Sequence, residues 1–233
     1  MRDADIALRL ADIRQRMARA AERAGRRAED VRLVAVSKTC SVDDVRAAVA
    51  AGQQDFGENR VQEALQKIDA ARDLPVRWHF IGHLQSNKAR KAAVPFVCIH
   101  SIDRGDLLEA VDRAAAEAGV APEVLVQVDL AGEPSKHGAA VDVVRGLVER
   151  AAHCRAVRLA GLMLLPPWLE DSEDVRPYFR ALRELRTRLC AEGAPEAMLR
   201  ELSMGMSHDF EIAIEEGATL VRVGSAIFGQ RQP

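Results

Sequence analysis

The 233 residues suit one barrel-sized domain or two small ones. Hydrophobic residues make up 48%, and the formal net charge of -2 provides no basic surface for nucleic acid or anionic membrane. The charged N-terminus lacks the apolar stretch of a signal peptide, and no apolar run approaches the roughly 18 residues of a membrane span. We therefore expect a cytoplasmic protein.

The first segment predicts an amphipathic helix, because Ile6, Leu10, Ile13 and Met17 recur at helical spacing before Gly25. Apolar and β-branched runs then predict eight strands, at residues 31–36, 54–56, 78–81, 96–100, 124–128, 157–163, 200–203 and 219–223. The intervening segments predict helices, one from the capping box of Ser41 and Asp44 to Gly52, and others at about residues 58–70, 86–92, 105–118, 141–152, 172–190 and 209–216.

Eight strands that alternate with helices predict an α/β fold, a single (β/α)8 barrel. Residues 1–233 form one domain in this interpretation, and residues 1–25 are an extra N-terminal helix. An open doubly wound sheet is the alternative. The strand count and the lack of a GxGxxG motif after the first strand favour the closed barrel.

The four cysteines, at positions 40, 98, 154 and 190, lie far apart and form no CxxC pair. This spacing excludes a local zinc knuckle and argues against a disulfide framework in a cytosolic chain. We expect thiols that are buried or incidental, and we predict no metal site.

A barrel places its site on the loops after the carboxyl ends of its strands. Those after the last two strands contain small residues, Ser203, Gly205, Ser207, Gly224 and Ser225. Small residues let backbone N–H groups approach a ligand, and barrels frequently bind phosphate at these two loops. The loops therefore predict a phosphate site, and tight turns with serine helix caps are the alternative.

Lys38 ends the apolar first strand. Only five of the 33 basic residues are lysines, and arginine cannot replace lysine in an imine, because its guanidinium stays protonated. Burial near the barrel axis would favour the neutral, nucleophilic amine. A lysine that extends into water is the alternative.

Arg222 precedes Gly224 by two residues on one strand, so both face the same side. An arginine inside a barrel needs an anion or an acceptor, and an internal salt bridge would also satisfy it. Together, an amine, a guanidinium and a phosphate cradle at one barrel mouth match the aldehyde, the ring nitrogen and the phosphate of pyridoxal 5′-phosphate (PLP).

Six motifs extend this interpretation over nearly the whole chain. They are VAVSK at 34–38, FGENRVQE at 56–63, WHFIGHLQSNK at 78–88, GLM at 161–163, LSMGMS at 202–207 and RVGSAIFG at 222–229. In these motifs and their order the sequence resembles the pyridoxal phosphate homeostasis proteins, small PLP-binding barrels of fold type III related to the N-terminal barrel of alanine racemase. Residues 39–41 depart from the family's commoner proline-containing continuation, and Ser225 stands where many members have threonine.

The resemblance implies a role for each matching residue. Lys38 would carry PLP as a Schiff base, Asn59 would lie beside the pyridine ring, and Arg222 would face the ring nitrogen. Ser203, Gly224 and Ser225 would hold the phosphate. The predicted binding set is completed by His83, Met163, Met204, Gly205 and Ser207. Lys136 matches a family segment without a defined role.

The resemblance also implies a monomer that stores or delivers PLP, with PLP-dependent apo-enzymes as partners. An amino-acid racemase-like enzyme is one alternative, and a Schiff-base aldolase without cofactor is another. Alanine racemase uses a tyrosine from an additional domain, whereas this chain ends at Pro233 and its only tyrosine is Tyr178. An arginine at the ring nitrogen also disfavours carbanion chemistry. We therefore predict no catalytic residue, although His83 is a possible base.

Overall fold

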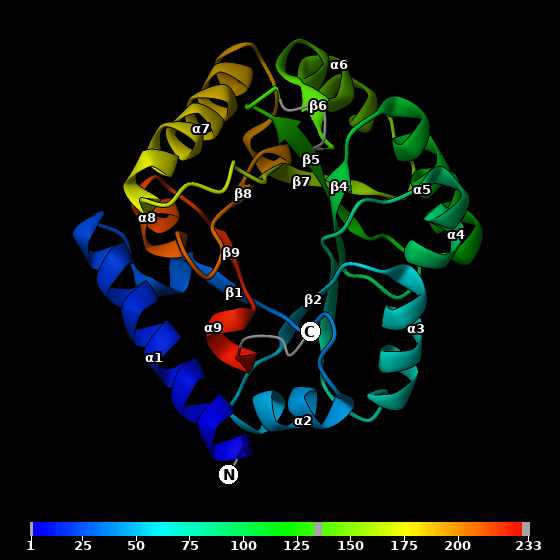
Figure 1. Ribbon diagram of the computed structural model, residues 1–233. Coiled ribbons are helices and arrows are strands. Elements are labelled where there is room, and N and C mark those ends of the chain that lie inside the picture. Colours follow the sequence, from blue (N-terminus) through cyan, green and yellow to red (C-terminus); the bar gives the residue numbers. More distant parts are fainter. Residues whose placement is uncertain (1, 133–136, 230–233) are drawn as a thin grey trace.

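The computed structural model describes residues 2–132 and 137–229, and it shows a ring of parallel strands enclosed by helices (Figure 1). The ring consists of β1 (Arg32–Val36), β2 (Asp55–Glu58), β3 (Arg77–Phe80), β4 (Cys98–Ile102), β5 (Glu123–Asp129), β7 (Arg158–Leu164), β8 (Glu201–Ser203) and β9 (Leu220–Val223). Each strand pairs in parallel with two neighbours, and the ring closes because β1 pairs with β9 and β4 with β5. The predicted (β/α)8 barrel is confirmed.

Helices cover the outside of the ring. They are α2 (Val42–Ala50), α3 (Val61–Ala70), α4 (Ala89–Ala92), α5 (Gly105–Ala118), α6 (Val141–Ala151), α7 (Arg176–Ala191) and α8 (Phe210–Glu215), with α9 (Ser225–Phe228) after β9. The predicted N-terminal helix is α1 (Arg2–Arg23), which packs against α2, α8 and α9. Among the described residues, no helix combines the length and the apolar composition that a membrane crossing requires.

Most predicted boundaries differ from the observed ones by one or two residues, and the larger differences have local causes. The second strand continues to Glu58, so α3 begins at Val61. The segment predicted as one helix at 172–190 is divided into η3 (Ser172–Val175) and α7, whose first turn contains Pro177. Proline has no N–H to donate and suits a first helical turn.

Several short elements divide a predicted helix or have no counterpart in the predictions. The helix predicted at 86–92 consists of η2 (Ser86–Lys88) and the one-turn helix α4. The other short elements are β6 (Ala139–Ala140), which pairs with β5, α9, η1 (Ala28–Asp30) and η4 (Glu196–Met198). Such elements are too short to show a hydrophobic period.

Successive side chains on each strand alternate between two apolar layers. One set packs under the helices in the main core. The other faces the barrel interior, where a smaller cluster is formed by Val34, Cys98, Leu125, Ala160, Met163 and Leu220. Many other inward positions are polar, among them His79, His100 and Ser203, so charged and hydrogen-bonded side chains occupy much of the interior.

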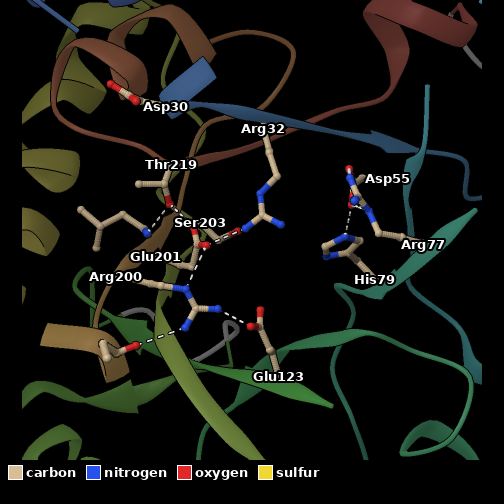
Figure 2. Close-up of polar contacts among 12 residues, drawn as sticks. Asp30, Arg32, Asp55, Arg77, His79, Glu123, Arg200, Glu201, Ser203 and Thr219 are labelled. Carbon is tan, nitrogen blue, oxygen red and sulfur yellow. Dashed lines mark hydrogen bonds and ion pairs between the residues drawn. The ribbon is translucent and has the colours of Figure 1, made fainter. Parts of the chain in front are cut away.

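Ion pairs fill the end of the barrel where the strands begin (Figure 2). Arg32 pairs with Glu201 at 2.5 Å, and Arg77 binds both carboxylate oxygens of Asp55 at 2.9 and 2.5 Å. Burial raises the pKa of Asp55, but hydrogen bonds from His79 and Arg77 outweigh it and lower this pKa to about 2. These pairs close the barrel opposite the mouth.

Asp55→Asn tests the acid sensitivity of this end. The pKa of Asp55 in the folded protein lies below its ordinary value of 3.8, so the ionised carboxylate stabilises the fold above that pH. This contribution of about 2 kcal/mol is lost as the pH falls from about 4 to 2. We expect the variant to show a smaller change in the free energy of unfolding over this range, measured by urea titration. An unchanged pH dependence would contradict the assignment.

Gly161 in β7 lies against the backbone of β8, where a Cβ atom would be 1.9 Å from the carbonyl oxygen of Glu201. Gly161→Ala therefore forces two paired strands apart, and we expect it to destabilise the protein by about 3 kcal/mol or to prevent folding. Gly146→Ala in α6 is the matched control, since a Cβ atom there meets nothing within 4 Å. It should stabilise the protein by up to about 1 kcal/mol. Equal unfolding temperatures for the two variants would contradict this close approach.

Candidate functional site

The carboxyl ends of the parallel strands meet at one end of the barrel, the mouth. The predicted site residues lie in the last part of a strand or in the loop that follows it: Lys38 after β1, Asn59 after β2, His83 after β3, Met163 in β7, Ser203, Met204, Gly205 and Ser207 at and after β8, and Arg222, Gly224 and Ser225 at and after β9. Lys136 lies outside the described residues. The strand order places the loops after β8, β9 and β1 next to one another.

Lys38 lies beside the loop that contains Gly224. The pairing of β1 with β9 sets Ala35 opposite Val223, and a Cβ atom on Gly224 would be 3.2 Å from the carbonyl oxygen of Val36. Lys38 itself is half-buried. The two strand ends therefore bring Lys38 and the loop of Gly224 to the same part of the mouth.

A buried polar cluster supports the backbone next to Lys38. The Ser37 hydroxyl donates to Glu58 Oε1 at 2.7 Å, and Lys67 Nζ donates to the same oxygen at 2.5 Å and to the Ser37 carbonyl at 2.6 Å. The side chains of Lys67 and Glu58 are only 9% and 1% exposed. Sequence analysis missed this pair, although a lysine is rare in this chain and Glu58 is the last residue of a fully buried strand.

Asn59 is positioned by a close approach between two loops. A Cβ atom on Gly82 would lie 2.1 Å from the carbonyl oxygen of Asn59. Glycine at position 82 therefore lets the loops after β2 and β3 touch, and it leaves Asn59 half-buried at the mouth.

Arg222 points into the barrel and is 3% exposed. Its guanidinium donates to Ser203 Oγ at 2.6 Å and to the Leu164 carbonyl at 2.8 Å. Burial lowers the pKa of Arg222 to about 10, against the opposing charge of Asp209, so it stays charged near neutral pH. Among residues 2–132 and 137–229, no carboxylate forms an ion pair with Arg222, so the internal salt bridge is not formed.

The hydroxyl of Ser203 is engaged inside the barrel. Its oxygen accepts from Arg222, and it lies 2.9 Å from Nδ1 of His100. The residue is fully buried. The predicted phosphate contact of this hydroxyl differs from the observed arrangement, in which both of its contacts lie in the barrel interior.

The loops after β8 and β9 are joined through Ser207. Its Oγ accepts from the backbone N–H groups of Gly224 at 3.2 Å and Ala226 at 3.4 Å. Gly205 has a φ of 93°, and a Cβ atom there would lie 2.6 Å from the Cβ of Ala213, so this turn requires glycine. The structure thus brings the small residues of both loops together, with Ser225 exposed beside them.

The two methionines of the predicted set lie in different layers, and both are fully buried. Met163 belongs to the interior cluster, whereas Met204 packs in the outer core under the helices. Ser203 points inward, so its neighbour along the extended chain points outward. The structure therefore does not place the Met204 side chain at the mouth.

His83 lies at the rim of the mouth, where its ring stacks on that of His137 with 3.6 Å between centroids. Its Nδ1 is 3.7 Å from Asp103 Oδ2. Burial and the neighbouring His137 lower the pKa of His83, and Asp103 acts in the opposite direction. The ligand atoms of these three side chains lie within 4.8 Å of one another, so the group could hold a metal ion that sequence analysis does not predict.

A pair of histidines inside the barrel was also missed by sequence analysis. Nδ1 of His79 and Nε2 of His100 are 3.0 Å apart, and Cys98 lies near both rings. The sequence did contain a signal for them, because His79 and His100 are each a polar residue within a predicted strand that is otherwise apolar. Burial raises the pKa of Cys98 well above its ordinary value, which disfavours the thiolate that a metal would require.

Lys67→Met tests the support beneath Lys38. It leaves the Glu58 carboxylate buried without its cation, and we expect a loss of about 3–5 kcal/mol in the free energy of unfolding. The double variant with Glu58→Gln has no buried charge and should recover part of that loss. Urea unfolding of both variants measures the difference, and a double variant no more stable than Lys67→Met would argue against the pair.

Comparisons with known proteins agree with this geometry. A family model described as the N-terminal domain of alanine racemase matches residues 8–232. Pyridoxal phosphate homeostasis proteins from Aquifex aeolicus and Pseudomonas aeruginosa are each 45% identical to this chain, and the alignments cover 86% of it and 87% and 85% of theirs.

Solved structures show the same relationship. PipY from Synechococcus elongatus with PLP bound is 40% identical, with a TM-score of 0.86, and the match covers 96% of this chain and 100% of PipY. The same fold is found in alanine racemase from Streptomyces coelicolor, which is 24% identical with a TM-score of 0.68. This match covers 95% of this chain and 59% of the racemase. The chain belongs to the family of the alanine racemase N-terminal domain, and its relatives within that family are pyridoxal phosphate homeostasis proteins.

Proposed function

We propose that this protein binds PLP at the barrel mouth and stores and delivers it in the homeostasis of PLP within the cell. The observation that carries the proposal is the pairing of β1 with β9, which sets Lys38 beside Gly224, with the buried guanidinium of Arg222 further inside. These groups match the aldehyde, phosphate and ring nitrogen of one cofactor. The PLP-bound structure of PipY supports the proposal.

The donors at the mouth fit PLP. A guanidinium has five N–H groups, and the two hydrogen bonds of Arg222 to Ser203 and Leu164 leave others for the ring nitrogen. In our proposal Lys38 forms the Schiff base and Asn59 lies beside the ring.

The phosphate is assigned to the joined loops after β8 and β9. Ser225 contributes its backbone N–H group, and Gly224 leaves room for the phosphate to approach the backbone. The Ser207 hydroxyl contributes its proton while its oxygen accepts from the N–H groups of Gly224 and Ala226. Ser203 takes part through Arg222, because its own hydroxyl is engaged in the interior. When bound, PLP supplies an aldehyde and an electron-withdrawing ring.

Two observations favour a carrier over a racemase-like enzyme, the second candidate. A guanidinium that donates to the ring nitrogen keeps that nitrogen unprotonated, which makes the ring a weaker electron sink. Tyr178, the only tyrosine, lies on α7 outside the ring of strands (Figure 1). The likeness to alanine racemase is a likeness of fold.

The proposal includes a setting for the protein. We assign it to the cytoplasm, as one domain of residues 1–233 and as a monomer that passes PLP to apo-enzymes. None of Cys40, Cys98, Cys154 and Cys190 forms a disulfide in the part of the chain that the structure describes, which suits a reducing compartment. Light scattering coupled to gel filtration measures the oligomeric state.

PLP added to the purified protein is expected to produce the visible absorbance of an imine, and borohydride should fix the label at Lys38, located by peptide mass spectrometry. Lys38→Ala should lose the imine absorbance and keep weak PLP binding through the phosphate loops. Lys91→Ala is the control, because Lys91 is an exposed residue of α4 and should leave absorbance and labelling unchanged. A protein that takes up no PLP would refute the proposal.

Two assays distinguish the carrier from the racemase-like enzyme: transfer of PLP to an apo-enzyme, and racemisation of amino acids. A carrier should restore activity to the apo form of a PLP-dependent enzyme and should not racemise amino acids. Racemisation that disappears in Lys38→Ala would instead establish the enzyme, and failure to release PLP would remove the delivery role.

A further inference from the structure

A hydrogen-bond chain crosses the barrel interior on five different strands. It runs from Arg222 through Ser203, His100 and His79 to Asp55, with donor–acceptor distances of 2.6, 2.9, 3.0 and 2.9 Å. Each member is at most 5% exposed. Strands β8 and β4 are not neighbours in the ring, so the bond from Ser203 to His100 spans the interior. Figure 2 shows the far end, where His79 and Arg77 meet Asp55.

The two ends of the chain set the direction of every bond in it. A guanidinium only donates, and a carboxylate only accepts. Between Arg222 and Asp55 there is one hydroxyl proton on Ser203 and, when both imidazoles are neutral, one proton on each ring. All four bonds are satisfied only if each donor points toward Asp55. His100 and His79 then both carry their proton on Nε2 and accept at Nδ1.

The surroundings keep the inner imidazole neutral. Burial lowers the pKa of His100 well below its ordinary value, and the charges of Arg222 and Arg32 act in the same direction. Cys98 lies beside both rings as a buried thiol whose own pKa is raised. A second proton on the inner ring is therefore opposed by nearby cations and by burial.

This direction has a consequence at the mouth. The single proton of Ser203 is committed to His100, so its oxygen is left as an acceptor for Arg222. Bonds that point the same way in a low-dielectric interior also polarise one another. The buried cation of Arg222 is thereby linked to the carboxylate of Asp55 at the opposite end of the barrel.

We propose that His100 and His79 are positioning residues for PLP, which hold Ser203 as an acceptor and, through it, aim Arg222 at the ring nitrogen. The inference rests on the proposed PLP site and adds to it two residues that act only through others. Removing the acceptor at His100 frees the Ser203 hydroxyl to rotate, and the guanidinium loses its fixed orientation.

The direction of the chain is tested without cofactor. NMR of isotope-labelled histidine side chains at neutral pH should show both His79 and His100 neutral and protonated at Nε2. A proton on Nδ1 of His100, or a doubly protonated His79, would reverse the chain, free the Ser203 proton and overturn the inference.

The link to the cofactor is tested by a matched pair of variants. His100→Gln keeps one acceptor and one donor, whereas His100→Phe keeps only the ring. We expect the Phe variant to shift the visible absorbance and to weaken PLP binding by roughly tenfold, while the Gln variant stays close to the unaltered protein. His153→Phe, at an exposed position after α6, is the control and should change neither. Equal losses in the Gln and Phe variants, or a loss in neither, would overturn the positioning role.

Ser203→Ala keeps the inference testable if His100→Phe does not fold. It removes the hydroxyl that joins His100 to Arg222 and should reproduce the shift in absorbance. An unshifted spectrum would overturn the inference. If the unaltered protein binds no PLP, the proposed function fails, and the NMR result still shows whether the chain itself is correct.

Discussion

A buried cation is the constraint on which the interior of this barrel depends. Taking a charge out of water costs several kcal/mol unless hydrogen bonds compensate for it. Arg222 is satisfied by a backbone carbonyl and by Ser203, and the row of polar groups continues to Asp55. Barrels of this type usually fill their interior with layers of apolar side chains. Here Val34, Leu125 and their neighbours fill only the space that the polar row leaves.

Closure of the ring sets the position of Lys38. Because β1 pairs with β9, the loop that follows the first strand lies against the loop that follows the last one. The position of Lys38 then depends on two supports of different chemistry. Gly224 packs against Val36 from one side, and the Lys67–Glu58 pair holds the Ser37 backbone from the other. The small size of Gly224 lets the two loops approach closely, whereas the ion pair holds the turn after β1.

The sequence was sufficient to predict the ring, because apolar runs alternate with helical periods and glycines mark the turns. It also placed Lys38, Arg222 and Gly224 at strand ends, which the structure brings to the same end of the barrel, because residue type and position both carry chemistry there. It missed Lys67 and the histidine pair, whose partners are far away along the chain. The interior contacts of the Ser203 hydroxyl were missed for the same reason, because a bond across the interior leaves no local pattern. The outward direction of Met204 follows from strand alternation once Ser203 is known to face inward.

The N-terminal helix packs against α2, and also against α8 and α9 at the other end of the described chain. Its buried face, which includes Ile6, Leu10 and Ile13, is synthesised long before two of those three partners exist. Contacts between such distant segments form late and slowly. During synthesis this apolar face therefore lacks two of its partners. The pairing of β1 with β9 that closes the barrel can form only after β9 has been translated.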